Sequence, residues 1–136
     1  MKNKIVFTNG CFDIIHAGHI HLLSSASNLG DKLIVGLNSD RSVKRIKGDS
    51  RPIQTQDSRK LILESFRFVD EVRIFNEDDP LALIKDIKPN ILVKGGDYSL
   101  QEIIGANFVL SYGGEVEIID YIDGYSSTKI IDESGK

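Results

Sequence analysis

The sequence has few of the residues that form disulfides and no stretch that could cross a membrane. Its 136 residues include one cysteine and no tryptophan. A single cysteine excludes a disulfide within the chain and is typical of a reducing compartment. No apolar run approaches the roughly 20 residues of a membrane-spanning helix, and the first residues do not have the pattern of a secretory signal. We therefore expect a cytoplasmic protein that does not contact membranes.

Net charge and chain length narrow further the classes of protein to which this chain can belong. The formal net charge is −3, which argues against general nucleic-acid binding, so we expect no nucleic-acid partner. Hydrophobic residues make up 40% of the chain and charged residues 27%, as in ordinary globular proteins. A chain of this length can bury one core and leaves little room for a second. The sequence predicts a single domain over residues 1–136.

Short apolar segments alternate with helical patterns along the chain. The predicted strands cover residues 5–8, 33–37, 72–75, 91–93 and 116–119. The predicted helices cover residues 19–29, 57–68, 80–87, 101–112 and 127–131. Such alternation indicates right-handed crossovers and a parallel sheet covered on both faces. We expect an α/β fold, a Rossmann-like doubly wound sheet of five parallel strands, with a long loop over the polar residues 41–56.

All three histidines lie within residues 16–21, and two of them flank a glycine in His16-Ala17-Gly18-His19. This segment follows the first strand and the turn Asn9-Gly10-Cys11-Phe12, and it opens the first predicted helix. A helix start offers unpaired N–H groups and the positive end of the macrodipole, so it attracts phosphate. Gly18 allows close approach to the backbone, and the imidazoles can donate to phosphate oxygens. The pattern predicts a nucleotide site.

The histidine pattern has two other interpretations. Histidines three residues apart also occur by chance on protein surfaces, or as half of a metal site. Cys11 and the three histidines do not complete a standard zinc ligand set. We therefore expect no metal site built by the protein alone.

Two further segments should reach the same edge of the sheet. Residues 38–40 follow the second strand, and Lys94-Gly95-Gly96-Asp97-Tyr98 follows the fourth. Doubly wound sheets bind ligands at the carboxyl ends of their strands, so these segments should meet the histidine turn. Asp97 adds an acceptor for a hydroxyl group. The alternative for residues 94–98 is an ordinary turn.

Cations are concentrated in one segment of this acidic chain. Five fall within eleven residues: Arg41, Lys44, Arg45, Lys47 and Arg51. They could form a solvated basic loop, or they could bind a triphosphate and its leaving pyrophosphate, with Lys44 and Lys47 as the main contacts. Near the C-terminus, Ser126, Ser127 and Thr128 precede the last predicted helix, where hydroxyls can cap the helix or hold phosphate.

The motifs Gly10-Cys11-Phe12-Asp13 and His16-Ala17-Gly18-His19 resemble the G-x-F-D…H-x-G-H signature of the cytidylyltransferase-like nucleotidyltransferases. The resemblance covers nearly the whole chain. Residues 8–13, 35–40 and 93–98 look most like the adenylyltransferase domain of bacterial ADP-heptose synthesis. That resemblance implies the HxGH type of the fold and a reaction between ATP, with Mg²⁺, and D-glycero-β-D-manno-heptose 1-phosphate.

The resemblance also implies roles for individual residues. His16 and His19 would stabilise the α-phosphate during transfer, and Lys47 would bind the β- and γ-phosphates. Contacts to the nucleotide or sugar phosphate would come from Asn9, Gly10, Cys11, Phe12, Gly18, Lys44, Lys94, Gly95, Asp97, Ser126, Ser127 and Thr128. In many bacteria the resembling domain is fused to a sugar kinase. No kinase segment is recognisable here, so we expect a separate kinase upstream, and a homodimer, because the resembling families often form dimers.

Three functions remain open at this point. Residues 59–72 also look like glycerol-3-phosphate cytidylyltransferase, which commonly has tryptophan where this chain has Ala17. That family usually has an arginine in its C-terminal motif, and residues 123–128 lack one. An FAD-synthase-like adenylyltransferase belongs to the same class of alternatives. The third possibility is a nucleotide-binding module without turnover.

Overall fold

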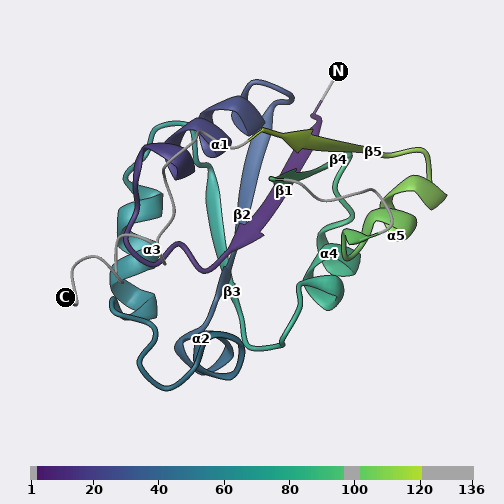
Figure 1. Ribbon diagram of the computed structural model, residues 1–136. Helices are drawn as coiled ribbons and strands as arrows, with labels where there is room; N and C mark the ends of the chain where they lie inside the picture. The colour runs from purple at the N-terminus through teal and green to yellow at the C-terminus, as the bar shows by residue number, and fades with distance from the viewer. Residues whose placement is uncertain (1–2, 97–101, 121–136) are drawn as a thin grey trace.

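The computed structural model describes residues 3–96 and 102–120, in which strands and helices alternate (Figure 1). The strands are β1 (Ile5–Gly10), β2 (Lys32–Asn38), β3 (Glu71–Phe75), β4 (Ile91–Gly95) and β5 (Glu115–Ile119). The helices are α1 (Ala17–Ser27), α2 (Asp40–Lys47), α3 (Gln56–Glu64), α4 (Leu81–Ile87) and α5 (Ala106–Ser111). All five predicted strands are confirmed.

The strands form one parallel sheet in the order β3-β2-β1-β4-β5. The chain moves outward from β1 to β3 in one direction, then returns and continues through β4 and β5 in the other. Strand order therefore reverses between β1 and β4, where a crevice forms at the carboxyl ends of the strands. The topology confirms the predicted doubly wound sheet.

Alternating side chains of the strands build a core on each face of the sheet. Val6 and Val35 pack on one face with Leu23 of α1 and Leu63 of α3. Phe7, Ile34 and Leu92 pack on the other face with Ile84 of α4 and Val109 of α5. Figure 1 shows α1 and α3 on one side of the sheet and α4 and α5 on the other. A strand buried on both faces must be apolar at successive positions, which explains the continuous apolar runs in the sequence.

The prediction of a loop over residues 41–56 was wrong for its first half, because Asp40–Lys47 forms helix α2. The Ser39 hydroxyl accepts a hydrogen bond from the Ser42 N–H and caps the helix. Asp40 lies in the first turn and three cations lie in the last, so both ends complement the helix macrodipole. Val43 is fully buried beneath the polar surface. The polar composition had obscured a capped helix.

Helix boundaries also differ from the prediction. Helix α5 begins at Ala106 rather than at residue 101, because Gly105 has a φ of 89° and a Cβ there would lie 2.7 Å from Cδ1 of Ile84. Helix α3 ends at Glu64 rather than at residue 68, and α1 begins at Ala17 rather than at residue 19. The helix predicted over residues 127–131 lies outside the described residues.

Removing the cap of α2 should destabilise the fold. Ser39→Ala deletes the hydroxyl that accepts the Ser42 N–H, and we expect the free energy of unfolding to fall by about 1 kcal/mol. Urea unfolding measures the difference. As the control, Ser111→Ala removes an exposed hydroxyl at the end of α5 and should change stability by less than about 0.5 kcal/mol. Equal stability of the two variants would contradict this role of Ser39.

Candidate active site

The two histidines cap α1 by hydrogen bonding to the backbone reciprocally. His16 is the N-cap residue, and its Nδ1 accepts the Gly18 N–H at 3.1 Å. In return, Nδ1 of His19 accepts the His16 N–H at 3.2 Å. The two rings stack with their centroids 3.9 Å apart. Both Nδ1 atoms are therefore acceptors, and the amide of Gly18 is already bonded within the helix start.

This geometry fixes the protonation state of both rings. Burial lowers the pKa of His16, and burial together with the charge of His16 lowers the pKa of His19 from its usual 6.5 to about 4. A second proton would have to sit on Nδ1, facing the backbone N–H that this atom now accepts. At neutral pH both rings are therefore uncharged and carry their proton on Nε2. His19 lines the cleft at the carboxyl ends of the strands, whereas the Nε2 of His16 is buried and His16 is not part of the lining.

The turn that leads to the histidines has a strained backbone. Phe12 and Ile14 have φ values of 48° and 63°, in the left-handed region that disfavours residues with a Cβ. Between them, the buried Asp13 accepts hydrogen bonds from Arg51 Nε at 2.9 Å, the Ile53 N–H at 2.8 Å and the Gln54 N–H at 2.9 Å. Burial tends to raise the pKa of Asp13, but these donors outweigh it and the pKa is lowered. The ionised carboxylate holds the turn against residues 51–54.

A cleft of about 520 Å³ opens at the carboxyl ends of β1, β2 and β4. Its walls include these predicted site residues: Asn9, Gly10, Cys11, Phe12, His19, Lys47 and Lys94. A smaller cavity of about 180 Å³ shares all of these except Lys47 and adds Leu22 and Gly95. The structure thus brings together residues from β1, α1, α2 and β4, as the strand-end argument predicted.

The cations of the basic segment separate in the structure. Lys47 and Arg51 line the cleft, whereas Lys44 lies on the exposed surface of α2 and is not part of its lining. Arg45 pairs instead with Asp78, with Nε 2.7 Å from the carboxylate. Lys94 approaches the cleft from β4, and burial, together with the charge of Lys47, lowers its pKa. The positive charge at the cleft therefore comes from three separate segments.

Cys11 lies at the centre of this site but is not activated. Burial raises the pKa of its thiol, although Lys47 and two arginines oppose the shift. A thiol with a raised pKa remains protonated at neutral pH and is a weak nucleophile. The chemistry of the site therefore rests on donors and cations.

Sequence reasoning missed several residues of the site. It did not single out Arg59, which contacts the carbonyls of Cys11 and Asn38. It also omitted Asp78 and Asp79, which line the cleft just after β3. The strand-end rule that located the other loops applies equally to residues following β3 and would have found them.

Four predicted site residues lie outside the described residues: Asp97, Ser126, Ser127 and Thr128. Within residues 3–96 and 102–120, no three histidine, cysteine or acidic side chains are grouped so that they could hold a metal ion. The same part of the chain contains no helix long and apolar enough to span a bilayer.

The chain is similar to known proteins along most of its length. A family model described as cytidylyltransferase-like matches residues 7–133. The bifunctional protein HldE of Campylobacter concisus is 56% identical over 130 residues, which cover 96% of this chain and 27% of that protein. HldE of Gluconobacter oxydans is 49% identical over 128 residues, which cover 94% of this chain and 27% of that protein. The chain thus spans about a quarter of the length of these relatives.

Solved structures share the fold. A lipopolysaccharide core biosynthesis protein from Thermoplasma volcanium is 30% identical, with a TM-score of 0.69, over 90% of this chain and 98% of that one. A pantoate-beta-alanine ligase from Francisella tularensis, complexed with beta-gamma ATP and beta-alanine, is 19% identical, with a TM-score of 0.60. That match covers 93% of this chain and 61% of the ligase, and it shows similarity of fold alone.

The protonation state of His19 is directly measurable. We expect ¹⁵N NMR of the free protein at neutral pH to show the neutral tautomer with its proton on Nε2, and the ring to titrate near pH 4. Because the unfolded chain takes up this proton near pH 6.5, stability should also decline as the pH falls from about 6.5 toward 4. A proton on Nδ1, or titration at pH 6.5 or above, would contradict the reciprocal cap.

Proposed function

The chain belongs to the cytidylyltransferase-like family, and on that premise we propose that it joins ATP to D-glycero-β-D-manno-heptose 1-phosphate. The products are ADP-heptose and pyrophosphate. Identity of 49–56% to HldE proteins over nearly the whole chain supports this choice within the family. Similarity to a protein of lipopolysaccharide core biosynthesis supports a sugar acceptor.

One observation carries the proposal: His19, which is stacked on His16 and accepts its N–H through Nδ1, lines a cleft together with Lys47 and Lys94. In the reaction, an oxygen of the sugar 1-phosphate attacks the α-phosphorus of ATP in line. The bond from that phosphorus to the β-bridging oxygen breaks, and pyrophosphate leaves with the electron pair. A phosphate oxygen is already ionised, so the reaction needs positioning and charge stabilisation rather than a general base.

Each group of the site has a role in this scheme. The Nε2–H groups of His16 and His19 donate to the α-phosphate oxygens as negative charge accumulates there. Lys47 binds the β- and γ-phosphates, whereas Lys44 lies on the same helix outside the cleft lining. The backbone of residues 10–12 seats the nucleotide. Lys94, Gly95, Asp97 and residues 126–128 are the proposed remaining contacts to the nucleotide or the sugar phosphate.

A divalent metal accompanies the nucleotide in this family, and we propose Mg²⁺. Mg²⁺ is usually held by substrate phosphates and water, with only one or two carboxylates. The ion would neutralise charge on the triphosphate. The scheme requires an upstream enzyme that phosphorylates the sugar, and we propose that the protein acts in the cytoplasm, where ATP is available. The expected homodimer stays a prediction.

An assay of pyrophosphate release tests the function. ATP and CTP are each paired with heptose 1-phosphate, glycerol 3-phosphate and riboflavin 5′-phosphate. We expect ATP with heptose 1-phosphate to give the highest kcat/KM. Preference for CTP with glycerol 3-phosphate, or for ATP with riboflavin 5′-phosphate, would assign one of the alternative transferases. Binding of ATP without release from any pair would indicate a nucleotide-binding module and contradict the proposal.

Substitution of one histidine tests the mechanism. His19→Ala removes a transition-state donor, so kcat should fall by roughly 100- to 1000-fold while the protein stays folded. The matched control is His21→Ala, which removes an exposed imidazole from the same helix and should retain kcat within about twofold. If a folded His19→Ala variant kept near-normal turnover, this histidine would have no part in catalysis.

A further inference from the structure

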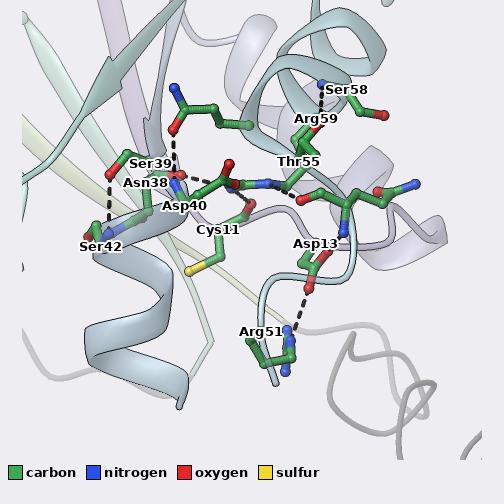
Figure 2. A network of polar contacts seen from close by, with 12 residues as sticks. Cys11, Asp13, Asn38, Ser39, Asp40, Ser42, Arg51, Thr55, Ser58 and Arg59 are labelled. Carbon is green, nitrogen blue, oxygen red and sulfur yellow. Dashed lines mark hydrogen bonds and ion pairs between the residues drawn. The ribbon is translucent and has the colours of Figure 1, made fainter. Parts of the chain in front are cut away.

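Arg59 is the largest fully buried side chain of the described residues, and it is charged. Its guanidinium donates from Nε to the Gln54 carbonyl at 3.0 Å and from Nη2 to the Asp40 carboxylate at 2.8 Å. Its Nη1 donates to the carbonyls of Cys11 at 2.7 Å and Asn38 at 2.8 Å. Figure 2 shows these contacts within one polar network. A buried cation is stable only when its donors are satisfied in this way.

The partners of Arg59 belong to separate segments that border the cleft. Cys11 follows β1 and begins the turn toward the histidines. Asn38 ends β2, and Asp40 opens helix α2. Gln54 belongs to the segment held by Asp13. One planar group therefore sets the relative positions of three chain segments, because its donors point in fixed directions.

The first of these segments needs such support. Phe12, directly after Cys11, has a φ of 48°, and Ile14 has a φ of 63°. Residues held in left-handed conformations persist only where their surroundings enforce them. Arg59 fixes the peptide carbonyl on the amino side of Phe12, while Gln54 accepts the Ile14 N–H at 3.2 Å. The turn then leads directly into the cap formed by His16.

The second segment carries a cation of the cleft. Helix α2 begins beside Arg59 at Asp40 and ends at Lys47, which lines the cleft. Eight helical residues extend about 12 Å, so a small change of direction at the first turn produces a larger displacement at the last. The contacts to Asn38 and Asp40 thus help to orient the helix that carries Lys47.

We propose that Arg59 is a positioning residue for the transfer reaction, and that it sets the histidine pair and Lys47 at the spacing that one triphosphate requires. The inference rests on the proposed function and deepens it. Arg59 lies outside the cleft lining, so it acts through the residues it holds. The competing explanation is that Arg59 contributes only to stability, in which case a folded variant would turn over normally.

The test compares Arg59→Lys with Arg73→Lys. Lysine keeps the charge at position 59 but cannot reach all four acceptors from one ammonium group. Arg73, on the edge strand β3, pairs with Glu71 of the same strand and with Asp86 of α4, so its variant controls for loss of an ion-paired guanidinium. We expect Arg59→Lys to lower kcat by at least about 30-fold with KM for ATP changed less than about threefold, and Arg73→Lys to change neither.

Correcting kcat for the fraction of folded protein distinguishes a positioning role of Arg59 from a purely stabilising one. Both enzymes are assayed well below their unfolding temperatures, and ATP-binding stoichiometry counts the folded molecules. A kcat loss that remains after this correction supports the proposal. A loss fully explained by unfolded protein, or normal kcat in folded Arg59→Lys, would overturn it. If Arg59→Lys does not fold, Asp40→Asn removes the charge partner but keeps an acceptor, and it should lower kcat about tenfold at unchanged KM.

A readout independent of turnover separates this inference from the proposed function. In the wild-type protein, added ATP should shift the NMR signals of both the histidine Nε2 atoms and the Lys47 ammonium. In Arg59→Lys, or in Asp40→Asn if that variant replaces it, the two responses should no longer occur together. If the wild type released no pyrophosphate with any substrate pair, the proposed function would be contradicted. If ATP still shifted the histidine and Lys47 signals together in the variant, the positioning role of Arg59 would be contradicted, whatever the outcome of the pyrophosphate assay.

Discussion

The reciprocal hydrogen bonds between His16, His19 and the first turn of α1 are the interaction on which the site depends. Each Nδ1 accepts a backbone N–H, so each ring is fixed in orientation and holds its proton on Nε2. Helix capping usually falls to serine, threonine, aspartate or asparagine. Here the same hydrogen bonds that begin a helix also prepare two neutral donors. The local stability of α1 and the proposed chemistry therefore have a common physical origin.

The rest of the fold places this cap where a ligand can reach it. Reversal of strand order between β1 and β4 opens the sheet at its carboxyl edge, and the cap stands at the end of β1. The strained turn of residues 12–14 brings the chain from strand to cap, and buried charged groups on Asp13 and Arg59 hold that turn. Polar groups are buried at this edge of the sheet, whereas the helix-covered faces are apolar. Burial of charge is thus concentrated where the backbone departs from regular structure.

Much of this was accessible from the sequence. Apolar runs predicted the strands, their alternation with helices predicted a parallel sheet, and the strand-end rule predicted that Asn9, His19 and Lys94 meet, as they do in the cleft. Helix α2 was missed because its polar composition outweighed the cap at Ser39. The distinction between Lys47 and Lys44 required the direction of that helix. The tautomers and the contacts of Arg59 could not be predicted, since they depend on atoms that are distant in sequence and within hydrogen-bonding distance only in the folded chain.

The most direct test of the account is a crystal structure of the protein with Mg²⁺ and an ATP analogue whose α,β-bridging oxygen is replaced by methylene. The account predicts that an oxygen of the α-phosphate lies about 3 Å from Nε2 of both His16 and His19, a normal hydrogen-bond distance. It also predicts that both Nδ1 atoms keep their backbone N–H donors. A triphosphate bound elsewhere, or rings turned so that Nδ1 faces the phosphate, would contradict the central claim.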